Sequence, residues 1–334
     1  MSAEALPFVW ISIIAFAIFM YVLLDGFVLG AGILFSFLPS DADRDTMMSS
    51  VAPIWDGNET WLVLGAGGLF AAFPLAYSIV LPALYLPFVL MLLGLVFRGI
   101  AFEFRFKAHR ARKVWDRAFQ WGSILATFCQ GLVLGAFVQG FAVEGTRYVG
   151  GPLDWLSPFG VMTALALVAG YALLGSTWLI MKAPGELERW ARKASRRLLL
   201  IVLLGIASIS VWVPFLNNAI RERWFSLPNF YWLSQVPLLT VITGLLHWRA
   251  SRAGYAIAPF LLTMTLFALG YLGLAISLWP NIVPHSISFT AAAAAPSSQQ
   301  FLLAGAAIAL PAVLCYTAYS YYVFRGKVDR PLGY

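Results

Sequence analysis

Three acidic residues of this chain lie within or at the start of long apolar segments. Asp56 and Glu59 stand three residues apart in Trp55-Asp-Gly-Asn-Glu-Thr-Trp61, directly before an apolar run, and Asp25 interrupts the apolar stretch around it. A carboxylate at membrane depth costs several kcal/mol unless it is paired, protonated or hydrated, which makes it a candidate for function. The chemistry that such residues can perform is the binding and transfer of protons.

The spacing of Asp56 and Glu59 places both on one face of a helix. Two interpretations stay open. In the first, Asp56 caps the helix next to Pro53 and Glu59 is a buried, hydrogen-bonded acid. In the second, these acids, Asn58 and Thr60 hold water in a proton-uptake path, to which Asp25 of the preceding helix also belongs. We take the second as the prediction.

Arg98 lies near the end of another apolar segment. It can pair with a membrane acid, pair with an anionic group of a partner, or extend along the helix to the membrane surface.

Gly26 and Gly30 form a small-xxx-small pair beside Asp25, and the two glycines at 131 and 135 form another. We expect both pairs to let helices approach closely.

The composition is that of a polytopic membrane protein. Of 334 residues, 61% are hydrophobic and 11% are charged, whereas soluble domains carry about 25% charged residues. The mean hydropathy is +0.81. The net charge of +7 does not indicate binding to nucleic acid, because the basic residues cluster between apolar segments.

The N-terminus lacks a basic region and a cleavage site, so the first segment is predicted to be a retained helix. Cys129 and Cys315 lie far apart in apolar segments, which argues against a disulfide or a zinc site.

About 20 apolar residues are needed to cross the hydrocarbon. The chain contains nine such segments, and we expect an all-α protein. Their approximate ranges are 8–37, 54–74, 78–101, 118–142, 157–181, 197–219, 229–248, 256–279 and 300–324.

Lysine and arginine set the predicted orientation, because basic loops stay on the cytoplasmic side. The connections at 102–117, 182–197 and 249–255 and the C-terminal segment, which includes Arg330, are basic, and the alternate connections are poor in basic residues. The N-terminus is therefore expected outside and the C-terminus in the cytoplasm. Asp25, Asp56, Glu59 and Arg98 then fall in the cytoplasmic half of the membrane.

Three histidines are present, namely His109, His247 and His285, and none is placed in the middle of an apolar segment. Axial haem ligands usually stand there, and no Cys-x-x-Cys-His motif occurs. We therefore expect that this chain ligates no haem and no other metal.

The ordered motifs of the chain resemble subunit II of cytochrome bd-type quinol oxidases, including the cyanide-insensitive branch. The resemblance runs along the whole length and rests on motifs at residues 23–32, 53–61, 97–105, 129–135, 280–286, 295–299 and 316–327. It implies nine transmembrane helices in two four-helix bundles (about 8–142 and about 157–279) and one peripheral helix (about 300–324).

The resemblance also implies a partner, subunit I, which carries two b-type haems, one d-type or alternative haem, and the quinol site. Such a complex oxidises quinol on the outer side of the bacterial cytoplasmic membrane and reduces dioxygen to water with cytoplasmic protons. Some members bind a structural quinone on subunit II, and small single-helix accessory subunits can join. Within this chain the resemblance implies that Asp25 and Asp56 lie on the proton route and that Arg98 serves haem assembly. Val28 replaces a second acid that the family often carries, so no role is transferred to that position.

The sequence thus predicts a non-haem subunit of a quinol:oxygen oxidoreductase that supports its partner and supplies protons. Its proton pathway is expected to comprise Asp25, Asp56, Glu59, Asn58 and Thr60. Two alternatives stay open: a secondary transporter with an acidic coupling site, and a purely structural subunit with inert buried acids.

Overall fold

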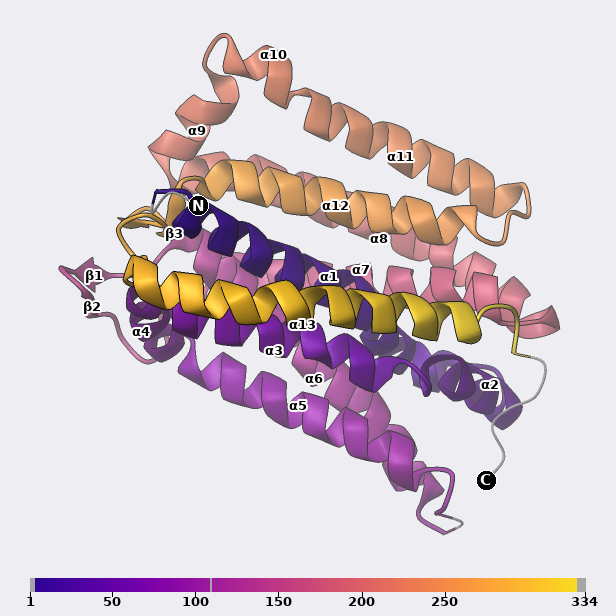
Figure 1. The fold of residues 1–334 in the computed structure, drawn as a ribbon. Coiled ribbons are helices and arrows are strands. Elements are labelled where there is room, and N and C mark those ends of the chain that lie inside the picture. Colours follow the sequence, from indigo (N-terminus) through magenta and orange to yellow (C-terminus); the bar gives the residue numbers. More distant parts are fainter. Residues whose placement is uncertain (1–3, 109, 329–334) are drawn as a thin grey trace.

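A computed structural model describes residues 4–108 and 110–328 of the chain. His109 and Arg330 lie outside these residues. The long helices run side by side along one direction, and short helices and hairpins gather at their ends (Figure 1). The long helices are α1 (Leu6–Leu34), α3 (Trp55–Ala72), α5 (Tyr85–Phe104), α6 (Arg112–Gln139), α7 (Pro158–Lys182), α8 (Gly185–Leu216), α11 (Gln235–Arg252), α12 (Ala258–Leu278) and α13 (Pro296–Val323).

In the described part of the chain, eight helical segments are long and apolar enough to cross a membrane. They correspond to eight of the nine predicted segments. The remaining one, predicted at 54–74, forms α3, which is 18 residues long and carries Asp56, Asn58, Glu59 and Thr60 in its first two turns. Helix α3 packs along α1 (Figure 1).

The predicted segment at 78–101 is not one continuous helix. Helix α4 (Pro74–Ala83) ends at Leu84, and α5 begins at Tyr85. Pro87 has no N–H to donate to the carbonyl of Ala83, so the helix cannot run straight through this point. The prolines here therefore break the segment into a short helix and a long one.

The other short elements lie at the two ends of the long helices (Figure 1). Helix α2 was not predicted, and it starts where the Ser40 side chain accepts a hydrogen bond of 3.1 Å from the backbone N–H of Asp43. The short elements are η1 (Phe35–Phe37), α2 (Asp41–Val51), α9 (Asn218–Phe225), α10 (Asn229–Leu233), and the hairpins β1 (Val143–Glu144) with β2 (Arg147–Tyr148) and β3 (Asn281–Val283) with β4 (Ile287–Ser288).

The two predicted glycine pairs do lie at close helix crossings. A Cβ on Gly30 would stand 1.8 Å from the backbone oxygen of Tyr171, and one on Gly131 would stand 2.3 Å from the Cα of Ala164. Neither distance leaves room for a side chain. Helix α7 therefore meets α1 and α6 backbone to backbone, which confirms the expectation from the sequence.

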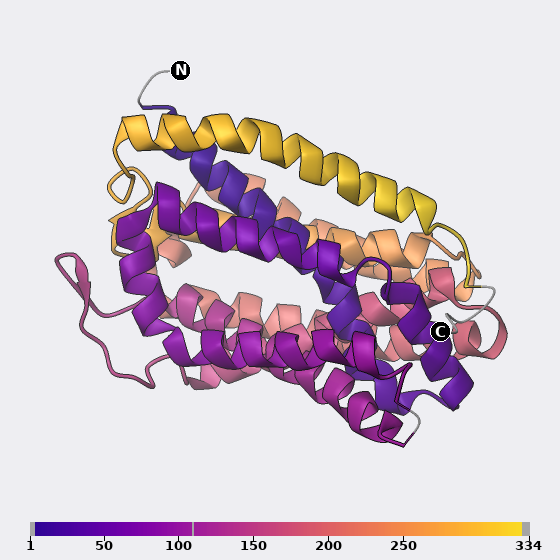
Figure 2. The same cartoon turned by 60° about the horizontal axis from the view of Figure 1, so that its bottom comes forward.

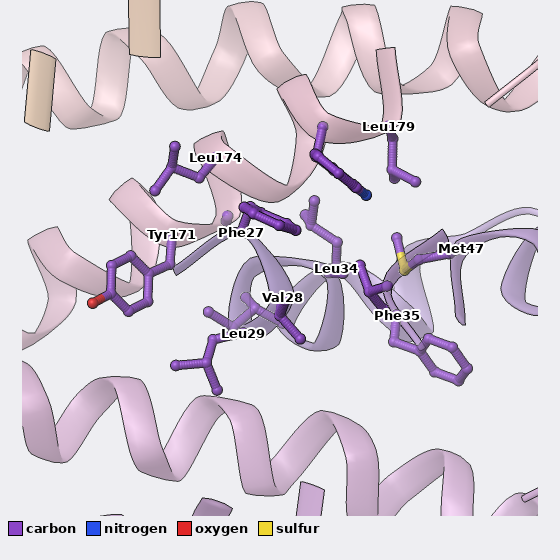
Figure 3. Close-up of a cluster of buried hydrophobic side chains, with 14 of the residues drawn as sticks. Phe27, Val28, Leu29, Leu34, Phe35, Met47, Tyr171, Leu174 and Leu179 are labelled. Carbon is purple, nitrogen blue, oxygen red and sulfur yellow. The ribbon is translucent and has the colours of Figure 1, made fainter. Parts of the chain in front are cut away.

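The central core lies between α1 and α7. The ring of Phe27 stacks on Trp178 with centroids 4.1 Å apart, and Figure 3 shows Phe27 close to Tyr171 and Leu174. Val28, which replaces the second family acid, is fully buried in this apolar cluster. Its environment is therefore suited to an apolar side chain.

Helix α13 lies along α3 and α1 on the outside of the molecule and leaves most of its surface exposed (Figures 1 and 2). The residues that follow it pack back onto the end of α7 and the start of α8. The backbone N–H of Val328 donates to the carbonyl of Lys182 at 2.9 Å, and Lys327 pairs with Glu188 at 2.5 Å. This end of the molecule also holds the basic connections α5–α6, α7–α8 and α11–α12, whereas the N-terminus lies at the opposite end (Figure 1).

Candidate functional site

Arg98 of α5 and Asp25 of α1 form an ion pair in the interior of the chain. Nη1 and Nη2 of Arg98 each donate to one oxygen of the Asp25 carboxylate, both at 3.0 Å. Both side chains are fully buried. Two parallel bonds of this kind fix the relative orientation of the two groups. Arg98 therefore pairs with a membrane acid, as one of the sequence interpretations anticipated.

Glu59 of α3 is the second carboxylate at Arg98. Its Oε1 accepts a hydrogen bond of 2.5 Å from Nη2, and 28% of its side chain is exposed. The ring of Trp55 lies over the guanidinium, with its centroid 5.5 Å from the Arg98 Cζ. One cation thus holds two acids from different helices, and one of these acids reaches the surface of the chain.

The other polar residues of α3 lie outside this ion cluster. Asp56 and Thr60 are exposed on α3. Asn58 is buried, where its Nδ2 donates to the Leu24 carbonyl at 2.8 Å and its Oδ1 accepts from the Tyr321 hydroxyl at 3.1 Å. Asn58 therefore ties α3 to α1 and α13, while Asp56 and Thr60 mark the exposed surface next to Glu59.

A second polar group that the sequence analysis missed continues from Asp25 into the core. The Tyr171 hydroxyl donates to Gln130 Oε1 at 2.9 Å, and Gln130 Nε2 donates to the Tyr21 hydroxyl at 2.8 Å. Tyr21 lies one helical turn before Asp25 on α1. These residues come from α7, α6 and α1. Gln130 was the one available signal, because it interrupts an apolar helix.

The local sequence explains how the cluster is positioned. Asp25 precedes Gly26, and the ring of Tyr171 would be 2.8 Å from a Cβ at that glycine. Without a side chain at 26, α7 can approach and bring Tyr171 into the core beside Asp25. Helix α3 begins at Trp55, so Glu59 falls in its second turn, beside the end of α5 that carries Arg98.

A separate group of charges lies at the basic end of the molecule. Arg105 is almost fully buried and pairs with Asp45 at 2.7 Å and with Asp116 at 2.5 Å, and Arg112 also pairs with Asp45. Partial burial disfavours the ionised form of Asp45, but hydrogen bonds from Arg112 and Arg105 outweigh it and lower the pKa of that carboxyl. This group joins α2 to the connection between α5 and α6.

Within the residues that the structure describes, no group of three or more His, Cys, Asp and Glu side chains is arranged to hold a metal ion. His247 is buried on α11, with its Nε2 3.5 Å from the Ser195 hydroxyl. His285 lies 3.0 Å from the carbonyl of Val138 at the opposite end of the molecule.

Known proteins with similar sequences and folds cover nearly the whole chain. The family model described as cytochrome bd terminal oxidase subunit II matches residues 6–324. The chain is 29% identical to cytochrome bd-I ubiquinol oxidase subunit 2 of Escherichia coli K12, with 98% of this chain and 96% of the relative covered. It is 27% identical to cytochrome bd ubiquinol oxidase subunit 2 of Bacillus subtilis, over 97% and 98% of the two chains.

The fold is similar to that of a chain in the bd oxidase structure from Geobacillus thermodenitrificans. The TM-score is 0.75 at 21% identity, and the match covers 96% of this chain and 97% of that chain. The sequence motifs, the apolar helices and the match along almost the full length agree. The chain belongs to the cytochrome bd terminal oxidase subunit II family, and it is a multi-pass protein of the bacterial inner membrane.

Proposed function

We propose that this chain is the non-haem subunit of a quinol:oxygen oxidoreductase, which supports a haem-bearing subunit I and supplies it with cytoplasmic protons. The relatives named as ubiquinol oxidase subunit 2 support the complex and its reaction class. One observation supports the proton role: the buried Arg98 holds two carboxylates, and one of them reaches the surface. We find no comparable support for a secondary transporter, because these relatives are oxidase subunits.

The proposed orientation rests on the positive-inside rule. The basic connections between the long helices gather at one end of the molecule, and the N-terminus lies at the other (Figure 1). We place the basic end in the cytoplasm and the N-terminus outside. Asp25 is closer to the basic end of α1 than to its start, so the ion cluster lies in the half of the membrane that protons enter from the cytoplasm.

In the proposed complex the redox chemistry belongs to the partner. Two b-type haems and one d-type or alternative haem in subunit I would carry electrons from quinol to dioxygen, and reduction of dioxygen to water consumes protons. Asp56 and Thr60 lie on the exposed part of α3, near Glu59, and in the proposed route they hold the water that brings protons to Glu59. The proposed route runs from the cytoplasm past these residues to the Asp25–Arg98–Glu59 cluster and then into subunit I.

Arg98 has a second proposed role in assembly. It joins α1, α3 and α5 through one buried guanidinium. Loss of a buried partner leaves an uncompensated charge, which costs about 3–5 kcal/mol. A variant without Arg98 should therefore misplace these helices and lower the haem content of the complex.

The test uses the assembled complex in lipid vesicles that oxidise quinol with dioxygen. Asp25→Asn, Asp56→Asn and Glu59→Gln are compared with Glu103→Gln, which changes an exposed acid at the end of α5. Each preparation is first shown to carry its full haem content. We expect lower turnover and charge separation in at least one variant of the proposed route and normal values in the control. Full activity in all three route variants would refute proton supply and leave a structural subunit.

A further inference from the structure

The charges of the buried cluster do not balance when all three groups are ionised. An arginine side chain stays protonated in proteins. One carboxylate neutralises it, and the second then leaves the cluster with one excess negative charge in a region of low dielectric. One of the two acids is therefore better accommodated with a proton, and the geometry distinguishes between them.

Asp25 is arranged as the permanent anion. It accepts two bonds from Arg98, each 3.0 Å long, and it is fully buried. The hydrogen-bond chain behind it has a fixed direction. Because Tyr171 donates to Gln130 and Gln130 donates to Tyr21, the Tyr21 hydroxyl accepts one bond and keeps its own proton to donate. Tyr21 itself lies one helical turn before Asp25 on α1. Arg98 thus donates to both oxygens of Asp25, and donors stabilise the ionised form of a carboxylate.

Glu59 has the opposite environment. A single bond of 2.5 Å joins its Oε1 to Arg98, and 28% of its side chain is exposed. It can therefore gain or lose a proton at its exposed part without breaking the Arg98–Asp25 pair. Besides Arg98 and Asp25, the titratable groups on the helices around it include Asp56 on its own helix and Tyr21 on α1. Helix α13 places Tyr316 beside Gly57 and Tyr321 at Asn58.

We propose that Glu59 is the proton-exchanging residue of this chain and that Asp25 is the fixed counter-ion of Arg98. A hydronium ion in the adjoining water gives its proton to a Glu59 oxygen, which forms a new O–H bond and leaves neutral water. The cluster then carries no net charge. Transfer of the same proton toward subunit I restores the anion. This assignment rests on the proposed function and specifies which side chain performs it.

The test is infrared difference spectroscopy of the intact complex during a pH change. A carboxylic acid that gains or loses a proton gives a C=O stretching band. We expect Glu59→Gln to lose one such band and to slow proton uptake by about tenfold or more. The bands of Glu103→Gln, which lies outside the cluster, should match those of the unaltered complex.

Persistence of every carboxylic-acid band in a haem-loaded Glu59→Gln complex would overturn the assignment, and so would loss of the same band in Glu103→Gln. Gln keeps an oxygen that can accept the bond from Arg98, so the variant retains the local geometry. The two proposals fail differently. If this chain supplies no protons, all acid variants keep normal proton uptake; if only the assignment is wrong, uptake falls in another variant while Glu59→Gln behaves normally.

Discussion

Removal of both acids at Arg98 should cost much more than the two single changes suggest. In Glu59→Gln, Asp25 still neutralises the guanidinium, so we expect a loss of less than about 1 kcal/mol in the free energy of unfolding. In Asp25→Asn, Glu59 becomes the remaining anion, although with one bond in place of two. In the double variant the fully buried Arg98 has no anion, and the expected cost is about 3–5 kcal/mol.

The assay is equilibrium unfolding of the purified complex in mixed micelles, with haem absorbance as an independent signal. The four proteins form a double-mutant cycle, and residues that share a partner should show a coupling energy of about 1–3 kcal/mol. Glu186→Gln is the matched control, because it breaks an ion pair with Arg189 in which both side chains are mostly exposed. Costs that simply add, or a double variant no less stable than the control, would refute the shared-cation reasoning.

Two further predictions concern stability. Gly30→Ala should destabilise the chain by about 3 kcal/mol, the upper end for overpacking, because the new Cβ would stand 1.8 Å from the backbone oxygen of Tyr171. Equilibrium unfolding at neutral pH measures this change, and an unchanged unfolding midpoint would contradict the prediction. Asp45→Asn should make the protein less sensitive to acid, because hydrogen bonds from Arg112 and Arg105 lower the folded-state pKa of Asp45. The stabilisation is present above the unfolded pKa of about 4 and disappears as the pH falls through the lower folded value. An acid-unfolding curve with the same slope in both proteins would show that Asp45 does not contribute.

The sequence was sufficient to locate the long helices. Backbone N–H and C=O groups inside a membrane must hydrogen-bond within their own segment, so each long apolar segment is expected to form a helix. The sequence also predicted the close crossings at Gly30 and Gly131, since residues without large side chains are what allow two backbones to meet. It did not predict where the basic connection after α7 becomes helical. Helix α8 starts at Gly185, where Glu188 and Arg192 pair one turn apart, and such local pairs extend a helix beyond its apolar part.

The sequence predicted which residues form the candidate site, but it did not predict how their side chains pair. Asp25, Glu59 and Arg98 were each identified as costly charges in apolar sequence. Their pairing depends on how three helices pack, and nothing in a single segment specifies that. For the same reason Asp56 and Glu59, three residues apart, have different surroundings: α1 and α5 cover Glu59 in part, while Asp56 is exposed. Tyr21 could not be linked to the site from sequence, because tyrosine in an apolar helix more often packs against lipid or core.

The central claim is that protons consumed by the oxidase pass through the buried ion cluster of this subunit, with Glu59 as the exchanging group. The most direct measurement is the rate of proton uptake from a weakly buffered solution with a pH indicator, timed against the reduction of dioxygen by the assembled, fully reduced complex. We predict that Glu59→Gln takes up protons more slowly, by about tenfold or more, and that Glu103→Gln does not differ from the unaltered complex. Equal uptake rates in Glu59→Gln and the unaltered complex, at equal haem content, would contradict the claim.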